Sequence, residues 1–372
     1  MENKIGYALV CFYEASIGGH GSAEVSKSLY ECLPKKNSKL FEIKKKKIFF
    51  FLENCKFNYL ENIYKFFYIL VIINKLKKFI NKYNKKIIII EGASWIGYTY
   101  IFFKIIRIFF PKILIIYHAH NIEYDVRKKR NNAIISFITK IIEKNVYKLI
   151  NFSTAVSEED KKRLKKLYNV NAYIFQNGIN KKRLSLRKPK FNLPKKYIIY
   201  SGSYSYKFNK ITINKIISKI MPTILKKFKD VKLIITGRDF PKEKFIKYNF
   251  IRNYKNLEKK ELNYLIKKSL FMFTPMNNSP GTKLKVIETL LLGANLITSR
   301  NGIKGIKFVK SDNLFIYSNI NKMYQYIYYL IRNHKEDKAN NISPLNNFYS
   351  KNYLMENILK NFFAEIKLSK NA

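Results

Sequence analysis

Cysteine is scarce in this sequence of 372 residues. The three cysteines, Cys11, Cys32 and Cys55, form neither a C-x-x-C pair nor an even set. Disulfide-stapled domains and zinc fingers need paired cysteines at regular spacing, so the pattern argues against both classes. Isolated thiols instead indicate a reducing compartment, and we expect them to be buried.

Long apolar runs are also missing. The most membrane-like stretch, 92–110, is broken by Lys104 and Arg107 and falls short of the ~20 apolar residues that a membrane span needs. Residues 1–4 lead straight into a short apolar run, without the charged and apolar regions of a secretory leader. We therefore expect a cytoplasmic protein that is either soluble or bound peripherally to the inner face of the membrane.

Acidic residues are few, with 25 Asp and Glu against 72 Lys and Arg, which gives a formal net charge of +47. The lysines are spread from end to end of the chain, as is typical of a solvated surface. The excess still favours an anionic partner, and an anionic membrane surface fits it as well as nucleic acid does. Because no basic segment carries interleaved aromatics and no RNA-binding signature is present, we predict no specific nucleic-acid partner. A basic nucleic-acid-binding protein stays open as an alternative that rests on the charge alone.

Short apolar runs alternate with longer helical patterns along the chain, which predicts parallel sheets with helices on both faces. Ser157, with Asp160 three residues on, has the spacing of a helix cap. A basic stretch at 181–196 contains two prolines and shows no hydrophobic periodicity, so it is interpreted as a linker between the domains. We expect two Rossmann-like domains, 1–185 and 186–350, and a terminal helix, 351–372, that packs back toward the first. The predicted strands lie at 5–12, 87–90, 113–117, 152–156, 172–175, 197–201, 231–236, 270–274 and 295–298.

A glycine turn in the second half carries the densest set of candidate binding groups. Gly281 and Thr282 precede a predicted helix that begins with Lys283 and Lys285. The N-terminus of a helix offers free amide groups and the positive end of a dipole, which suits a diphosphate. Glu288, in the second turn, is placed to accept hydrogen bonds from ribose hydroxyls. A surface helix with a charged face is the alternative.

Two histidines stand at the end of a central predicted strand. His118 and His120 are two residues apart and share one face of that strand. Such a pair could bind a metal, but the sequence shows no third ligand of a zinc set nearby, so we predict no metal. For His118 we expect a structural, hydrogen-bonded role.

These segments, in this order and spacing, resemble family 4 of the glycosyltransferases, which have the GT-B fold. The resemblance covers nearly the whole chain and implies two Rossmann-like domains whose parallel sheets face an interdomain cleft. It also implies a retaining transfer from a UDP- or GDP-linked sugar, with no cofactor and no required metal. The matching segments are GG at 18–19, YHAHNIEY at 117–124, STAVSEEDKKRL at 153–164, QNGI at 176–179, YSGSYSYKFN at 200–209, KLIITG at 232–237 and SPGTKLKVIETLLLGANLITSRNGIKGI at 279–306.

The resemblance implies a donor-binding set in the second domain. Glu288 would bind the nucleotide ribose and take part in catalysis, and Lys283 and Lys285 would lie at the diphosphate. Pro280 stands where the family usually has its first glutamate, so a non-catalytic partner subunit of the same fold stays open as an alternative. The remaining expected donor-binding residues are Gly202, Gly281, Thr282 and, as a substitute cation, Arg238.

In the first domain the resemblance implies that His120 touches the transferred sugar or the acceptor, as a catalytic residue. Asn121, Glu123 and the turn at Gly18 and Gly19 would line the acceptor side. The acceptor would be a saccharide or a lipid-linked molecule, used in the assembly of surface polysaccharides or glycolipids. The stretch 100–112 interleaves apolar and basic residues, which is typical either of a helix at a membrane interface or of a buried helix of this domain.

Overall fold

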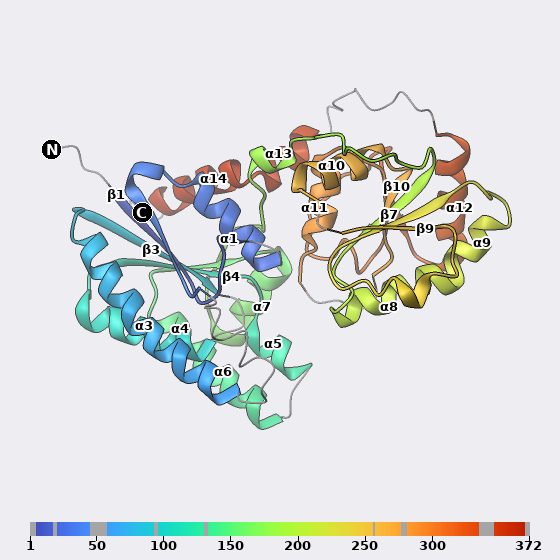
Figure 1. The fold of residues 1–372 in the computed structure, drawn as a ribbon. Helices are drawn as coiled ribbons and strands as arrows, with labels where there is room; N and C mark the ends of the chain where they lie inside the picture. The colour runs from blue at the N-terminus through green and yellow to red at the C-terminus, as the bar shows by residue number, and fades with distance from the viewer. Residues whose placement is uncertain are drawn as a thin grey trace. The chain divides into compact units, whose positions relative to one another are not determined.

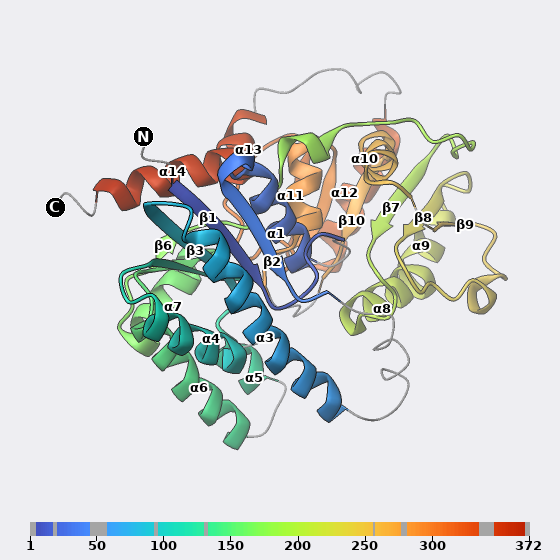
Figure 2. The same cartoon turned by 60° about the vertical axis from the view of Figure 1, so that its left-hand side comes forward.

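The computed structural model describes residues 5–17, 21–44, 58–92, 96–129, 133–255, 257–276, 281–334 and 346–368. The chain divides into two compact units, Met1–Asn180 with Ile358–Ala372, and Lys181–Asn357. Each unit contains a six-stranded parallel sheet with helices packed against it (Figures 1 and 2). The expected boundary lay after residue 185, with 351–372 as a separate helix. In the structure the first break comes at Asn180, and the chain from Ile358 belongs to the first unit.

The sheet of the first unit is built from buried aliphatic strands. Its central strand β3 carries four consecutive isoleucines, 87–90, and the last three of them are buried, as expected for a strand covered on both faces. The order of strands is β2-β1-β3-β4-β5-β6, and all neighbours are parallel. The strands are β1 (Ile5–Cys11), β2 (Ser38–Glu42), β3 (Lys85–Gly92), β4 (Leu114–Ala119), β5 (Phe152–Ala155) and β6 (Tyr173–Ile174).

Three helices lie side by side on one face of this sheet: α3 (Asn58–Ile80), α4 (Ile96–Phe109) and α6 (Ala133–Lys148) (Figures 1 and 2). Each joins strands that follow one another in the same direction across the sheet, so right-handed crossovers place all three on the same side. Helix α1 (Gly21–Cys32) joins β1 to β2 in the opposite direction and therefore packs on the other face. The shorter helices α5 (Glu123–Lys128) and α7 (Glu158–Tyr168) follow β4 and β5.

The last helix, α14 (Met355–Leu368), packs on the first unit through aromatic side chains. The ring of Phe362, which is 2% exposed, meets the ring of Phe175 at 5.2 Å and that of Tyr173 at 6.0 Å, both edge-on. Phe363 meets Tyr7 of β1 at 5.7 Å. Such pairs add to the free energy gained by burying the rings, which explains why the chain from Ile358 belongs to the first unit.

The second unit repeats the plan, with strand order β12-β11-β10-β7-β8-β9 and parallel neighbours throughout. Helix α8 (Lys207–Lys215) continues through a π-helical turn, Ile216–Ile220, into α9 (Met221–Leu225). Pro222, which has no N–H for the helical ladder, is the second residue of α9. The strands are β7 (Tyr197–Ser201), β8 (Lys232–Thr236), β9 (Ile251–Tyr254), β10 (Phe271–Thr274), β11 (Leu296–Ser299) and β12 (Leu314–Tyr317), and the other helices are α10 (Lys259–Lys268), α11 (Leu284–Leu291), α12 (Ile320–Arg332) and α13 (Asn346–Tyr353).

The edge strands β2, β9 and β12 and the helix α12 are among the described elements that were not predicted from the sequence. The three strands lie at the edges of their sheets and have four or five residues each. Edge strands are short and half-exposed, so their residues carry neither the continuous apolar run of a buried strand nor a long alternation.

We expect Phe362→Ala to lower the stability of the first unit by about 3–5 kcal/mol, because it removes a buried aromatic ring and leaves a cavity against Tyr173 and Phe175. Thermal unfolding followed by near-ultraviolet circular dichroism measures the change. Lys360→Ala, at an exposed position of the same helix, is the control and should leave the midpoint unchanged. Equal midpoints for both variants would contradict the docking of α14.

Candidate functional site

A carboxylate and two imidazoles meet where β3 and β4 of the first unit end. The parallel register pairs Glu91 of β3 with His118 of β4, and the next pair is Gly92 with Ala119. His120 follows directly, and its backbone N–H donates to the carbonyl oxygen of Gly92. Glu91, His118 and His120 are all buried.

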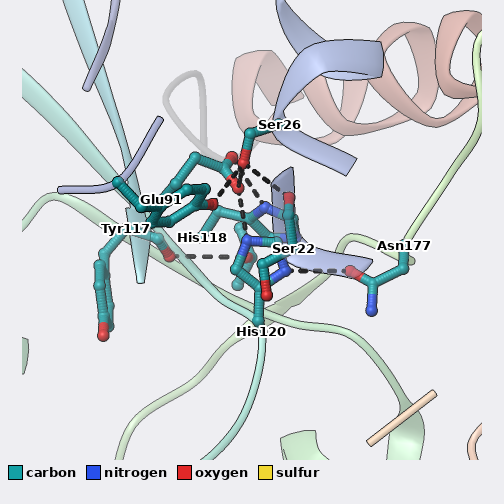
Figure 3. A network of polar contacts seen from close by, with 9 residues as sticks. Ser22, Ser26, Glu91, Tyr117, His118, His120 and Asn177 are labelled. Atoms are coloured by element: carbon teal, nitrogen blue, oxygen red, sulfur yellow. Dashed lines mark hydrogen bonds and ion pairs between the residues drawn. The ribbon is translucent and has the colours of Figure 1, made fainter. Parts of the chain in front are cut away.

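Glu91 accepts hydrogen bonds from both histidines (Figure 3). Its Oε1 lies 3.0 Å from His118 Nδ1, and its Oε2 lies 2.5 Å from His120 Nε2. Burial by itself would raise the pKa of Glu91, but the two imidazoles outweigh burial and hold this pKa well below its usual range. Glu91 is therefore a carboxylate at any physiological pH.

The network continues on both sides of Glu91. Ser26 of α1 donates to Glu91 Oε2 at 2.8 Å, and the hydroxyl of Tyr13 lies 2.6 Å from the Ser26 hydroxyl. On the other side His120 Nδ1 lies 3.3 Å from Oδ1 of Asn177, in the loop that follows β6 (Figure 3). Both ring nitrogens of His120 thus have partners inside the first unit, so a substrate that binds through Nδ1 must displace Asn177.

The same three residues form a set that could hold a metal ion. Glu91, His118 and His120 each offer one ligand atom, and these atoms lie within 4.8 Å of one another. The sequence argument against a metal was that no third ligand stood near the histidines. The structure corrects that argument, because Glu91 is distant in sequence and adjacent in the sheet. The expectation of no metal stays a prediction, and in this structure the candidate ligand atoms are hydrogen bonded to one another.

Asn121 and Glu123 lie in the turn after His120. Asn121 is half-buried, and Glu123 is buried at the first position of α5, with its Oε2 3.9 Å from Nε of Arg127. The backbone N–H of Glu123 donates to Oε1 of Glu143, on α6, at 2.8 Å. Gly18 and Gly19, the other expected acceptor residues, lie outside the described residues.

Glu143 is a buried carboxylate that the sequence did not single out. It caps α5 by accepting from the backbone N–H groups of Glu123 and Tyr124, at 2.8 and 3.0 Å, and it also accepts from the Tyr168 hydroxyl at 2.5 Å. Burial raises the pKa of Glu143 to about 7, although these hydrogen bonds oppose the change. The group therefore titrates near neutral pH.

In the second unit the loops after β7 and β8 pack tightly on each other. The N–H of Gly202 donates to the carbonyl oxygen of Thr236 at 2.9 Å. Gly237 has φ +126°, and a Cβ there would lie 2.4 Å from the Gly202 carbonyl oxygen, so only glycine fits this position. Arg238, the expected substitute cation, is exposed in the β8 loop, and its carbonyl oxygen accepts from the N–H of Tyr204.

The expected diphosphate turn precedes α11. Gly281 has φ 71°, a left-handed conformation that glycine adopts without strain. Thr282 follows half-buried, and Lys283, at the N-cap position of α11, is 7% exposed and donates to the carbonyl oxygen of Gly281. Pro280 lies outside the described residues.

Lys285 points inward, toward the turn that contains Gly202. Its ammonium group donates to the carbonyl oxygen of Ser201 at 2.7 Å and lies 3.2 Å from the hydroxyl of Tyr200 and 3.3 Å from Oδ1 of Asn209. Desolvation, together with the charge of neighbouring Lys283, lowers the pKa of Lys285 to about 7. Lys285 and Gly202 are both expected in the donor set. The structure brings them together, because the carbonyl oxygen that accepts from Lys285 belongs to Ser201, which directly precedes Gly202.

Glu288 forms an ion pair with Lys259, the first residue of α10. Both side chains are largely covered, with 13% of Glu288 and 25% of Lys259 exposed. The sequence did not indicate this partner, because Lys259 is one of many lysines. A ribose that binds to Glu288 would meet a carboxylate whose orientation is already set by this lysine.

The basic and apolar stretch 100–112 belongs mainly to α4, which buries one side in the core of the first unit and leaves Ile108 and Phe109 exposed. Phe102, Phe103 and Ile106 are in the core, and Nε of Arg107 donates to the carbonyl oxygen of Leu149 at 2.7 Å. Among the described residues, no helix has the length and apolar character needed to cross a membrane.

No family model matches the sequence, and no curated protein matches it. Solved structures match the fold along almost the whole chain. Anabaena Alr3699/HepE, in complex with UDP and glucose, has a TM-score of 0.68 at 11% identity over 97% of this chain and 99% of its own. Sucrose-phosphate synthase from Thermosynechococcus elongatus has a TM-score of 0.68 at 12% identity over 99% and 100%. A UDP-N-acetylglucosamine 2-epimerase has a TM-score of 0.52 at 15% identity over 90% of each chain.

Two Rossmann-like units with parallel six-stranded sheets, matched end to end by these structures, define the GT-B fold. The predicted fold class is therefore confirmed. At 11–15% identity the likeness shows the fold alone, since one fold serves many reactions.

The titration of Glu143 predicts a pH-dependent stability. Its pKa in the folded protein, about 7, lies above the value of ~4.3 in an unfolded chain. The stability that it contributes is therefore fully present below the unfolded pKa and is lost as the pH rises through about 7. We expect wild type to lose roughly 1–3 kcal/mol between pH 5 and pH 8 relative to Glu143→Gln, which does not titrate. Urea unfolding at both pH values measures this difference, and parallel pH profiles for the two proteins would contradict it.

Proposed function

We propose that this protein is a glycosyltransferase that moves a sugar from a nucleoside-diphosphate donor to an acceptor hydroxyl with retention of configuration. One observation carries the proposal: a glycine turn and Lys283 directly precede α11, and Lys285 and Glu288 lie in its first two turns, in a chain that matches HepE from end to end. HepE binds UDP and glucose in its crystal structure, so we propose a UDP-linked sugar as the donor.

The second unit would hold the donor. The free amide groups at the start of α11 and the ammonium group of Lys283 suit the diphosphate. Glu288, held by Lys259, would accept hydrogen bonds from the ribose hydroxyls. Gly202 and Gly281 allow the donor to approach the backbone closely, because neither carries a side chain. Thr282 and Arg238 complete the proposed donor set.

When the bond to the sugar breaks, negative charge grows on the leaving diphosphate. The dipole of α11 and the two lysines would stabilise this charge, and preorganised groups of this kind commonly supply a large part of the catalytic effect. Such a site fits a reaction that proceeds without a metal ion, as we propose.

The first unit would hold the acceptor, a saccharide or a lipid-linked molecule in surface polysaccharide or glycolipid assembly. His120 would contact the transferred sugar or the acceptor, and Asn121, Glu123, Gly18 and Gly19 complete the proposed acceptor set. Glu91 is added to this proposal as a positioning residue, because its carboxylate fixes the ring of His120. The pairing resembles the way a carboxylate orients a catalytic imidazole in hydrolases.

The likeness to an epimerase gives the second candidate function, in which the protein binds a UDP-sugar and changes the sugar itself. A non-catalytic partner subunit is the third, prompted by Pro280. Turnover of UDP-sugars separates them: release of UDP supports transfer or its hydrolytic side reaction, a new UDP-sugar supports epimerisation, and neither product supports the partner subunit. Nuclear magnetic resonance of the glycoside product then decides whether its anomeric configuration is retained.

We expect Glu288→Ala to raise the dissociation constant for UDP at least tenfold, about 1.4 kcal/mol, because the ribose loses its acceptor and Lys259 loses its partner. Titration calorimetry measures the constant. Glu243→Ala removes an exposed carboxylate elsewhere in the second unit and should bind UDP as wild type does. Unchanged affinity in the Glu288 variant would remove this residue from the donor site.

Lys285 predicts that donor binding depends on pH. Its pKa is about 7 without a ligand, so above this pH the side chain loses the charge that attracts a diphosphate. We expect the ratio of the UDP dissociation constants of wild type and Lys285→Arg to rise about tenfold between pH 6.5 and pH 8.5, because arginine stays charged. The titration of UDP itself affects both proteins equally, so the ratio of the two dissociation constants reports the charge of Lys285 alone. A ratio that is flat with pH would contradict the assignment.

A further inference from the structure

The outer surface of the first unit carries an unusual arrangement on α6. Its outward side chains in the first half are apolar, with Ile134 69%, Phe137 63%, Ile138 49% and Ile141 46% exposed. The side chains that face the sheet include polar ones, Ser136, Thr139 and Glu143, all buried. A helix on the surface of a water-soluble domain normally has the opposite arrangement, with its apolar stripe toward the core.

Helix α3 shows a related anomaly. Among its side chains from Phe66 onward, the inward ones are aliphatic, as expected, and Ile69, Ile72, Ile73, Leu76 and Ile80 are buried. Its outward ones include Phe66, Phe67, Leu70 and Val71, which are 40–60% exposed. From Phe66 to Ile73 this helix is apolar on all sides, which is typical of a buried or membrane-contacting environment.

These two helices share one face of the molecule, because α4 packs between them on the same side of the sheet (Figures 1 and 2). Helix α4 adds the exposed residues Ile108 and Phe109, together with Lys104. We call the outward surface of α3, α4 and α6 the helical face. It is an apolar patch of the kind that marks an interaction site on a soluble protein.

The charges on the helical face have one sign. Among the side chains of α3, α4 and α6 that the structure describes, the exposed charged ones are all lysines, and they include Lys75, Lys78, Lys144 and Lys148. The single carboxylate in this set is Glu143, which is buried. Two copies of such a face would repel each other, whereas an anionic surface would attract it.

We propose that the helical face is a docking surface for an anionic lipid bilayer, with the aromatic and aliphatic side chains among the acyl chains and the lysines at the phosphate groups. Exposed apolar residues flanked by lysines bind such interfaces through burial of apolar area and through charge. This inference does not depend on sugar transfer. If the proposed function also holds, docking would bring the first unit to lipid-linked acceptors.

The first test measures binding of the full chain to vesicles of phosphatidylglycerol and phosphatidylcholine by co-sedimentation. We expect the double variant Phe67→Ser, Phe137→Ser to bind at least tenfold more weakly than wild type. The matched control, Ile246→Ser with Ile320→Ser, removes exposed apolar residues from the second unit and should bind as wild type does. Equal loss in both double variants, or no loss in the first, would overturn the proposal.

A second pair of variants separates this face from the general positive charge of the protein. Lys75→Glu with Lys144→Glu should weaken binding at least tenfold, because each lysine at an anionic surface contributes to the attraction. Lys219→Glu with Lys226→Glu makes the same change in charge at exposed sites of the second unit and should weaken it far less. Equal effects would mean that charge acts without a defined surface, which would overturn the proposal.

Two controls identify other occupants of the helical face. If a second copy covered it, sedimentation would show a wild-type dimer and a monomeric Phe67→Ser, Phe137→Ser variant, and the membrane proposal would fall. If another part of this chain covered it, the same variant would lose thermal stability, with the same consequence. The UDP-induced shift in the unfolding midpoint is measured on the same preparations. A missing UDP shift in wild type would count against the donor site and leave the vesicle result standing.

Discussion

Parallel pairing of the central strands is the constraint on which the rest of both units depends. Because all strands of a sheet run the same way, their carboxyl ends lie at one edge and the loops that follow them meet there. In the first unit this pairing sets Glu91 beside His118. In the second it brings the turns at Gly202 and Gly237 into contact. The candidate binding groups of each unit are a consequence of strand direction.

Three ionisable groups are withdrawn from water in three different ways. Glu91 keeps its charge because two imidazoles donate to it. Glu143 has backbone and tyrosine donors only, and these do not offset its desolvation. Lys285 is turned toward uncharged acceptors, while Glu288 in the same helix is paired with Lys259. Lys285 therefore has no carboxylate partner among the described residues that holds its proton. A bound anion would raise its pKa and keep it charged, which suits a diphosphate site.

In the first unit, helix α6 turns polar side chains toward the sheet and apolar side chains toward solvent. Helix α6 buries Glu143, which caps α5 and accepts from Tyr168, and this contact orients the polar side of α6 inward. Its apolar residues must then face outward, beside those of α3. The orientation of α6 thus determines both features: it places Glu143 inside, at the cap of α5, and it places the apolar residues on the helical face.

The sequence by itself determined what depends on neighbouring residues. The cap of α7, in which Ser157 accepts from the N–H of Asp160 at 3.1 Å, was predicted from their spacing. The strand with four isoleucines and the helix that carries Lys285 and Glu288 were also predicted from local patterns, whereas the GT-B fold class followed from the resemblance of the whole chain to a glycosyltransferase family. Short edge strands such as β2 were not predicted, because a few half-exposed residues show no distinctive hydrophobic period. The tertiary structure alone decided which distant residues meet. Glu91 joins the two histidines through strand register, Lys259 reaches Glu288 from another helix, and Lys285 turns inward beneath Gly202. The physical reason is that helix and strand periods are local, whereas such contacts depend on register and packing between segments far apart in the chain.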